Sequence, residues 1–456
     1  MKKIINFVLI ILIVFFALIA YLSLWCVARF GYLEFSQIIF HIFLPLKEAP
    51  TDWSEDICFS FVLLAANLFC ILYVWHTLTR KNISVLVISL LAFITFDCWY
   101  TNKYFHVLDF IKAQNKTSKF IEANYVNPKT RKIIFPENKK NLIFIMVESL
   151  ETSYQNKANG GLFDHNYISE LTQIAKENIS FSHSDKIEGA IVPPACTWTV
   201  AGTVAQTAGV PLKAYGNGNS MGFYQLFLPN TVALGDILLT NGYANFALFN
   251  TWAGYGGISD YMEQHGHYII KDVKIIRNVS DERLFQIAKT DLKDISLKTP
   301  FSLFIQTIDT HFGKKGDFKK TSKAVADFIK WLQKQSFFAN TVVVVTGDHC
   351  NMNPSDFMDL EHSDEHERKV FNVFINPAIM PKKTSYRKFS TLDIFPTVLA
   401  ALGADVEGNK LGLGVNLFSD EKTLFEQFDL SYIFDELKKR SPFYDRKILF
   451  SKPHQK

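Results

Sequence analysis

The chain has 456 residues, enough for two or three domains, and 48% of them are apolar, including 42 phenylalanines. Its net charge is only +4 and its basic residues are dispersed, which argues against a nucleic-acid-binding protein. Six cysteines in a chain of this length do not make the framework of a small disulfide-rich domain.

The first hundred residues contain three apolar segments that we expect to cross a membrane. Ile4 to Val27 and Ile57 to Trp75 carry no charged side chain, and each is long enough for a hydrocarbon core of roughly 30 Å. Ile83 to Tyr100 includes Asp97, which lies near the end of the segment beside aromatic residues typical of the membrane interface. The first segment exceeds the apolar length of a cleaved signal peptide, so we expect an uncleaved helix. Residues 1–100 are therefore assigned to a membrane region of about three helices.

Basic residues near these segments predict the orientation of the chain in the membrane. Lys2, Lys3, Arg80 and Lys81 are expected on the cytoplasmic side by the positive-inside rule. Three spans then place everything after residue 100 outside the cytoplasm. The loop after the first span is also expected outside, and its pattern F-S-Q-I-I-F-H-I predicts a short interfacial helix.

Residues 101–140 mix lysines with apolar residues at near-helical spacing, including Phe105, Leu108, Ile111 and Phe120. This pattern favours an amphipathic connector lying on the membrane surface. A solvated linker is the alternative.

The region 141–420 alternates strand and helix patterns, which predicts an α/β domain with a mostly parallel sheet covered by helices on both faces. The apolar runs at 141–147 and 342–345 are expected to be strands buried on both faces. Residues 421–456 are assigned to a C-terminal extension. Further strands are expected at 245–249 and from residue 301, and helices at 167–177, 199–208, 234–240 and 320–335.

Polar residues follow the two buried strands. Glu148 ends the first run, and Asp348 and His349 follow Gly347 at the end of the second. Because open α/β sheets bind ligands beyond the carboxyl ends of their strands, we expect these side chains to hold a divalent metal ion. The alternative is that Asp348 caps a helix and His349 is a surface residue.

Thr199 begins a short helix of small residues that ends at Gly209. The unpaired N–H groups at a helix N-terminus favour an anion such as a phosphoryl group, so Thr199 is a candidate nucleophile. Its hydroxyl would need a base or a metal to become reactive. A plain N-cap is the alternative, and Thr197 and Thr203 compete for the same role.

Two cysteines of the region after residue 100 flank the motifs just described. Cys196 lies three residues before Thr199, and Cys350 directly follows His349. A disulfide between them in an oxidising compartment and two free thiols are both compatible with the sequence.

Five motifs occur in the order found in the alkaline-phosphatase/sulfatase superfamily. Within that superfamily the chain resembles the membrane-bound phosphoglycerol and phosphoethanolamine transferases, a group that includes the lipoteichoic acid synthases, over about residues 25–420. The resemblance implies an N-terminal set of transmembrane helices followed by a sulfatase-like α/β domain. The motifs are V-E-S-L-E at 147–151, C-T-W-T-V-A-G at 196–202, L-G-D-I-L-L-T-N-G-Y at 234–243, T-G-D-H at 346–349 and S-T-L-D-I-F-P-T-V-L-A-A-L-G at 390–403.

The resemblance also implies roles for single residues. Glu148, Thr199, Asp348 and His349 match the metal ligands of the family, and Thr199 matches its nucleophile. The metal is expected to be Mn²⁺ or Zn²⁺, since imidazole and carboxylate ligands suit these ions, with Mg²⁺ as an alternative.

Other matched residues concern the substrate. His311 matches a histidine that contacts the phosphoryl group or the acceptor, and Trp252 matches a headgroup contact, although no arginine follows it as in the lipoteichoic acid synthases. His362 and His366 are candidates for a second metal or for substrate binding, and their charged stretch is equally typical of a solvated loop. The proline and arginine of the sulfatase C/S-x-P-x-R motif do not follow Cys196, so sulfatase activity is not expected.

The function implied by the resemblance is transfer of a headgroup in the cell envelope. Phosphatidylglycerol or phosphatidylethanolamine would donate a phosphoglycerol or phosphoethanolamine group, which would pass through a phospho-threonine to a glycan acceptor. The protein is expected in the bacterial inner membrane as a multi-pass protein, with the catalytic domain on the periplasmic side. An ester hydrolase of the same superfamily is the alternative. A binding module without activity is a third hypothesis, and the complete set of metal ligands argues against it.

Overall fold

The chain forms two compact units in a computed structural model, which is described here for residues 2–30, 33–42, 65, 83–213, 227–250, 255–270, 279–298, 300–352, 356 and 367–449. The first unit comprises Met1–Phe35 and Pro45–Lys112, and the second comprises Ser36–Leu44 and Ala113–Lys456. The residues expected to form a connector are thus divided between the two units. The second expected span, Ile57 to Trp75, lies outside the described residues apart from Ala65.

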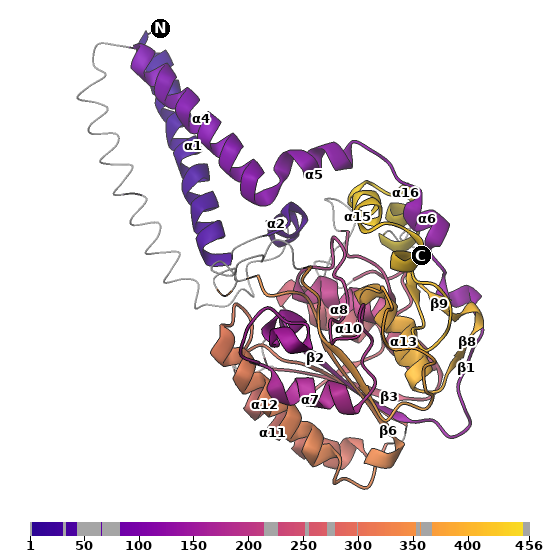
Figure 1. Ribbon diagram of the computed structural model, residues 1–456. Coiled ribbons are helices and arrows are strands. Elements are labelled where there is room, and N and C mark those ends of the chain that lie inside the picture. Colours follow the sequence, from indigo (N-terminus) through magenta and orange to yellow (C-terminus); the bar gives the residue numbers. More distant parts are fainter. Residues whose placement is uncertain are drawn as a thin grey trace. The chain divides into compact units, whose positions relative to one another are not determined.

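The first unit contains two long apolar helices. Helices α1 (Lys2–Phe30) and α4 (Ile83–Phe105) pack side by side (Figure 1). The stretches Ile11–Ala28 and Ile83–Phe105 have the length and apolar composition needed to cross a membrane. The first and third expected spans are therefore helices of suitable length, and their insertion in a membrane stays a prediction. Helix α5 (Val107–Gln114) follows α4 and has no buried residue.

The second unit is built on a six-stranded sheet with the strand order β4-β3-β5-β2-β6-β7. All neighbouring pairs are parallel except β6 and β7, which are antiparallel. The prediction of a mostly parallel sheet is therefore confirmed. The strands are β2 (Asn141–Val147), β3 (Ala244–Phe249), β4 (Tyr268–Ile269), β5 (Phe301–Gln306), β6 (Thr341–Gly347) and β7 (Asn372–Ile375).

The two strands that precede the candidate site residues are neighbours in the middle of this sheet. Every residue of β2 and β6 is buried, as expected for parallel strands covered on both faces. Strands β5 and β6 pair with opposite edges of β2, so the order of the strands reverses there. The carboxyl ends of β2 and β6 thus lie at the position where open α/β sheets bind their ligands.

Helices cover both faces of the sheet (Figure 1). Each set of helices packs its apolar side chains against one face and forms one of two hydrophobic cores. The prediction of a sheet between two helical layers is confirmed. One layer contains α7 (Ser169–Glu177), α11 (Asp281–Ile295) and α12 (Lys315–Leu332), and the other contains α8 (Thr199–Ala208), α9 (Leu234–Thr240), α10 (Ile258–Gln264) and α13 (Ile394–Ala401).

Short elements complete the second unit. The C-terminal residues are part of it, because Leu424, Ile433 and Tyr444 belong to one of the two cores. The buried Lys213 ammonium donates to the backbone carbonyl of Lys439, 2.7 Å away, and fixes the end of α15. The short elements of the second unit are the paired strands β1 (Ile133–Ile134) and β8 (Asp405–Val406), the paired strands β9 (Lys410–Leu411) and β10 (Gly414–Val415), and the helices α2 (Phe35–Ile42), α6 (Phe120–Asn124), α14 (Leu424–Gln427), α15 (Leu430–Lys438) and α16 (Pro442–Tyr444).

Most element boundaries agree with the sequence patterns, with one informative difference. The helix expected at 320–335 begins five residues earlier, at Lys315. Asp317 accepts a hydrogen bond from the Lys314 N–H at 3.1 Å and satisfies one of the free donors at the start of this helix. A stretch rich in lysine and glycine does not predict the start of a helix, so the start expected from the sequence lies five residues too late.

Candidate active site

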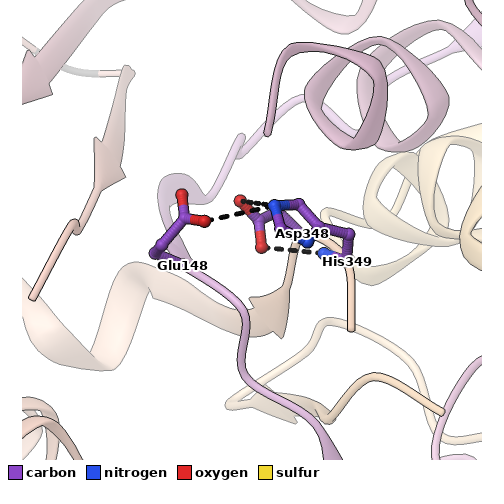
Figure 2. A group of neighbouring side chains, drawn as sticks. All are labelled: Glu148, Asp348 and His349. Carbon is purple, nitrogen blue, oxygen red and sulfur yellow. Dashed lines mark hydrogen bonds and ion pairs between the residues drawn. The ribbon is translucent and has the colours of Figure 1, made fainter. Parts of the chain in front are cut away.

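Glu148, Asp348 and His349 come together at the carboxyl ends of β2 and β6 (Figure 2). The two strands pair in register, Val147 beside Gly347, so the residues that follow them are neighbours. One ligand atom from each of the three side chains lies within 4.8 Å of the others, and all three residues are fully buried. The structure thus brings together three of the residues that the sequence singled out.

The Asp348 carboxylate is held in place from both sides. Its Oδ1 accepts hydrogen bonds from the backbone N–H groups of Ser149 and His349, each at 2.7 Å. Its Oδ2 accepts from the Gln306 side chain at 3.2 Å. The two backbone N–H groups fix the orientation of the Asp348 carboxylate. One of its lone pairs remains directed toward Glu148 and His349, which is the orientation that a metal ligand needs.

The His349 ring is oriented by the backbone. Its Nδ1 lies 2.8 Å from the carbonyl oxygen of Cys350, which can only accept, so Nδ1 carries the proton and donates. Its Nε2 lies 3.1 Å from Glu148 Oε1 and 3.7 Å from Asp348 Oδ2. A histidine that donates one ring N–H to a carbonyl and turns the other nitrogen toward carboxylates has the usual arrangement of a metal-binding imidazole.

Burying three ionisable groups together shifts their pKa values in opposite directions. Burial and the Glu148 charge raise the pKa of Asp348 to about 8. Burial acts to raise the pKa of Glu148 as well, but the adjacent His349 outweighs it and holds this pKa at about 2. Burial acts to lower the pKa of His349, and the two carboxyl groups raise it to about 9. Two buried carboxyl groups in contact therefore compete for one counter-charge, and a divalent cation would neutralise both, so these residues fit a metal ion.

Thr199 is the first residue of α8, and its hydroxyl faces the same group of side chains. Thr199 Oγ1 donates to Glu148 Oε2 at 3.0 Å and lies 3.4 Å from His349 Nε2. By contrast, Thr203 Oγ1 is bonded back to the Thr199 carbonyl at 2.9 Å, and Thr197 precedes the helix. The Thr199 hydroxyl, at the N-terminus of α8, thus faces Glu148 and His349, an arrangement that suits a phosphoryl group.

Two glycines allow these segments to approach one another. A Cβ atom added at Gly202 would lie 2.5 Å from the Asp348 carbonyl oxygen, and one at Gly347 would lie 1.9 Å from the Leu150 carbonyl oxygen. Only glycine therefore fits where α8 crosses the end of β6 and where β6 passes the loop after β2. The motifs A-G-T and T-G-D-H owe their glycines to this close packing.

The backbone is strained at three places around the site. Ser149, Ala195 and Phe312 have φ values of 54°, 61° and 55°, a region that L-residues with side chains rarely adopt. Ser149 follows Glu148, Ala195 leads into the segment before Thr199, and Phe312 follows His311. Such strain costs about 1–3 kcal/mol per residue and is typical of functional sites. Sequence patterns carry no signal for it.

The loop after β5 carries His311 and is bonded to Glu148 on both sides. Thr307 Oγ1 accepts from the Glu148 N–H at 3.1 Å, and the Thr310 hydroxyl donates to the Glu148 carbonyl. The half-buried His311 lies near enough that its charge also lowers the pKa of Glu148. The loop that carries His311 is therefore fixed against Glu148 by Thr307 and Thr310.

Asp281 holds this loop and was missed in the sequence. Its Oδ1 accepts from the backbone N–H groups of Ile308 at 3.0 Å and Asp309 at 3.2 Å, and from the Asn250 side chain at 2.8 Å. Its Oδ2 accepts from the Thr321 hydroxyl at 2.7 Å. A buried aspartate at the start of α11 thus joins the ends of β3 and β5. An acidic residue after the N-cap Ser280 is typical of any helix start, so the pattern did not distinguish it.

A buried ion pair supports the loop after His349. Glu151 is fully buried and accepts from the Arg368 side chain Nε at 2.8 Å and from the Asn351 N–H at 3.0 Å. Glu151 stands in the V-E-S-L-E motif, whereas nothing in the sequence pointed to Arg368. Cys196 and Cys350 are free cysteines, so the alternative of a disulfide between them is not realised.

Three expected substrate or metal residues lie outside the described part of the chain. They are Trp252, His362 and His366. Their proposed roles stay predictions.

Comparisons with known proteins agree with the superfamily that the five sequence motifs indicate. The model of the family described as Sulfatase matches residues 140–404. Phosphoglycerol transferase I of Escherichia coli O127:H6 is 29% identical over an aligned length of 353 residues; the match covers 69% of this chain and 43% of that protein, and the Shigella flexneri protein of the same name gives the same values. The chain thus spans less than half the length of these relatives.

The solved structures that match this chain include a lipoteichoic acid synthase and a periplasmic domain. The lipoteichoic acid synthase LtaP of Listeria monocytogenes is 17% identical, with a TM-score of 0.47 over 66% of this chain and 82% of that one. The C-terminal periplasmic domain of EptC from Escherichia coli is 14% identical, with a TM-score of 0.44 over 61% of this chain and 87% of that one.

Proposed function

The chain belongs to the Sulfatase family, and from this membership together with the geometry of the site we propose that it is a metal-dependent phosphotransferase. It transfers a phosphoglycerol or phosphoethanolamine headgroup from a phospholipid to a glycan of the cell envelope. The names of the curated relatives favour phosphoglycerol, and hence phosphatidylglycerol as the donor. The observation that carries the proposal is the Thr199 hydroxyl, 3.0 Å from Glu148, at a helix N-terminus beside Asp348 and His349.

The metal ligands in this proposal are Glu148, Thr199, Asp348 and His349. Their mixed carboxylate, hydroxyl and imidazole donors suit Mn²⁺ or Zn²⁺, and Mg²⁺ is the alternative. A divalent cation held there would lower the pKa of the Thr199 hydroxyl and offset the negative charge on the phosphoryl oxygens.

The residues of the chain account for the two steps of a double displacement. Thr199 Oγ1 bonds to the phosphorus as the bond from phosphorus to the diacylglycerol oxygen breaks. The hydroxyl proton is already shared with Glu148, and the leaving diacylglycerol oxygen takes up one proton, so protons balance. The N–H groups at the start of α8 and His311 bind the phosphoryl oxygens. An acceptor hydroxyl then bonds to phosphorus as the bond from phosphorus to Thr199 Oγ1 breaks, and the proton of the acceptor hydroxyl passes to Thr199 Oγ1.

This chemistry requires the catalytic unit to face the membrane that holds its donor. We propose that α1, the segment Ile57 to Trp75 and α4 cross the bacterial inner membrane, with Lys2 and Lys81 in the cytoplasm. The sulfatase-like unit then lies on the periplasmic side, where both the phospholipid and the glycan are available. Trp252 is assigned to the headgroup, and His362 and His366 to a second metal or the acceptor.

Mass spectrometry of the Thr199 peptide tests the proposal. The full-length protein is incubated with vesicles of phosphatidylglycerol or of phosphatidylethanolamine and quenched in acid. A glycerol-phosphate or ethanolamine-phosphate mass on Thr199 identifies the headgroup, and Thr199→Ala is the control without an adduct. A free phosphate ester product with no dependence on glycan would indicate the ester hydrolase instead. Absence of any adduct and of any diacylglycerol with either lipid would refute headgroup transfer.

A further inference from the structure

Helix α2 lies in the sequence between two apolar segments, yet it is part of the catalytic unit. Residues Ser36–Leu44 group with Ala113–Lys456 and not with the apolar helices. Its Ser36, Gln37 and Phe40 side chains lie on one face of the helix and are buried, Phe40 with only 1% of its surface exposed. The sequence predicts a short interfacial helix; the structure confirms the helix and shows that one of its faces packs on protein, while its position at a membrane interface stays a prediction.

The residues that α2 contacts stand next to the candidate catalytic residues. The Phe40 ring packs on the Trp198 ring, with 5.4 Å between their centroids. The Gln37 side chain donates to the Met352 sulfur at 3.4 Å. Trp198 is the residue before Thr199, and Met352 lies three residues after His349. One helix therefore contacts both of the segments that carry the proposed nucleophile and metal ligands.

The position of α2 in the chain limits its distance from a membrane. Helix α1 ends at Phe30 and α2 starts at Phe35. Five residues span at most about 18 Å when fully extended. If α1 crosses the bilayer and ends at its surface, the first residue of α2 starts within this distance of the plane in which phospholipid phosphates lie.

We propose that α2 positions a phosphate ester that is held in the bilayer over Thr199, with Phe40 as the positioning residue because it holds α2 against Trp198. This inference rests on the proposed function and adds to it the helix that presents the lipid donor. The half-buried Ile38 and Ile39 of the same helix offer apolar surface to the diacylglycerol part. A soluble phosphodiester has no such part, so it reaches Thr199 without the help of α2.

Comparing a lipid and a soluble donor on the same full-length protein tests the inference. The lipid donor is phosphatidylglycerol in vesicles, followed by release of diacylglycerol, and the soluble donor is bis(p-nitrophenyl) phosphate, followed by release of nitrophenol. We expect Phe40→Ala to lower kcat/KM for the lipid at least tenfold and to leave kcat/KM for the soluble diester within about threefold of the wild type. Phe40→Leu, which keeps most of the apolar volume, should recover part of the loss. Phe15→Ala, at an exposed position of α1, is the matched control and should change neither value.

Each outcome separates this inference from the proposed function. Equal losses with both donors would show that Phe40 only supports the fold, and equal retention with both would show that α2 is not needed; either result overturns the inference and leaves the proposed function intact. A wild type that cleaves the soluble diester in a Thr199-dependent manner but never the lipid overturns both. A wild type without any Thr199-dependent release overturns the proposed function first.

Discussion

Thr199 Oγ1 donates a hydrogen bond to Glu148 Oε2, 3.0 Å away, so the first hydroxyl of α8 points at the carboxylate that follows β2. This contact joins the start of α8 to the carboxyl end of β2. A substitution of Glu148 or His349, two of the proposed metal ligands, therefore directly changes the surroundings of the Thr199 hydroxyl, the proposed nucleophile.

Replacing a metal ligand should remove the metal and the activity together. Glu148→Gln, Asp348→Asn and His349→Ala each remove one of the three buried side chains proposed to bind the metal. Even the loss of a residue that only hydrogen-bonds to a metal ligand typically weakens metal binding roughly 10- to 100-fold. We expect each purified variant to contain less than half of the wild-type metal by elemental analysis and to show no turnover. Asp327→Asn, at an exposed ion pair with Lys323, is the control and should keep both. Full metal content in all three variants would disprove the assignment of the ligands.

Gly202 should tolerate no side chain. A Cβ at this position would lie 2.5 Å from the Asp348 carbonyl oxygen, so Gly202→Ala must shift α8 or the segment that carries the proposed metal ligands Asp348 and His349. We expect at least a hundredfold loss of turnover, about 2.7 kcal/mol of barrier, and a lower melting temperature. Gly316→Ala, in α12 with no atom within 4 Å of the new Cβ, should be neutral or stabilising by up to about 1 kcal/mol. Wild-type activity in Gly202→Ala would mean that α8 does not need its present approach to β6.

The sequence predicted those features of the site that follow from periodicity and strand ends. Continuous apolar runs located β2 and β6, and their in-register pairing then placed Glu148 beside Asp348 and His349. What the sequence could not predict depends on contacts between distant segments. Asp281 and Arg368 reach the site region through such contacts, and nothing local in the sequence marks them.

The same limit applies to backbone strain and to helix packing. Ser149 has a positive φ because hydrogen bonds on both sides of Glu148 constrain that turn, and a serine in a sequence does not reveal it. The apolar pattern of α2 predicted a helix correctly. It could not tell whether that helix packs on lipid or on protein, because both environments select the same residues.

Asp281 should make the stability of the second unit depend on pH. Burial, and then repulsion from Asp309, raise the pKa of the Asp281 carboxyl from 3.8 to about 6. The folded state then binds more protons than the unfolded state between about pH 4 and 6, so the free energy of unfolding contributed by this group is highest below pH 4 and falls as the pH rises through 6. The size of the effect is up to about 3 kcal/mol. The protonated carboxyl keeps its three bonds at Oδ1 and can donate to the Thr321 hydroxyl.

Thermal unfolding of wild type and Asp281→Asn at several pH values measures this contribution. The other titrating groups are the same in both proteins, so their effects cancel in the difference. We expect the wild type to lose stability relative to Asp281→Asn as the pH rises from 4 to 6.5. A difference in stability that does not change with pH, or that changes in the opposite sense, would show that ionisation of the Asp281 carboxyl does not destabilise the folded state.

Reporter fusions should locate the second unit outside the cytoplasm. A periplasmic reporter enzyme fused after residue 120 should be active, and the same reporter fused after Lys81 should be inactive, because the positive-inside rule keeps Arg80 and Lys81 in the cytoplasm. A cytoplasmic reporter fused at the same two positions is the control and should give the reverse. If the fusion after residue 120 is active only with the cytoplasmic reporter, the catalytic unit has no access to a periplasmic glycan and the proposed acceptor is wrong.

The last prediction concerns which of three threonines forms the covalent intermediate. Thr199 Oγ1 lies 3.0 Å from Glu148 and 3.4 Å from His349, whereas the Thr203 hydroxyl is bonded to the Thr199 carbonyl and Thr197 precedes the helix. Thr199→Ala should therefore lose the phosphoryl adduct completely. Thr199→Ser should keep part of the activity, because the hydroxyl remains and only the methyl group that restricts its rotamer is lost. Thr197→Ala and Thr203→Ala should stay within about tenfold of the wild type, or about 1.4 kcal/mol of barrier. Mass spectrometry of the tryptic peptide reads all four variants in one experiment, and an adduct that survives Thr199→Ala but disappears in Thr197→Ala would move the nucleophile to the residue before Trp198.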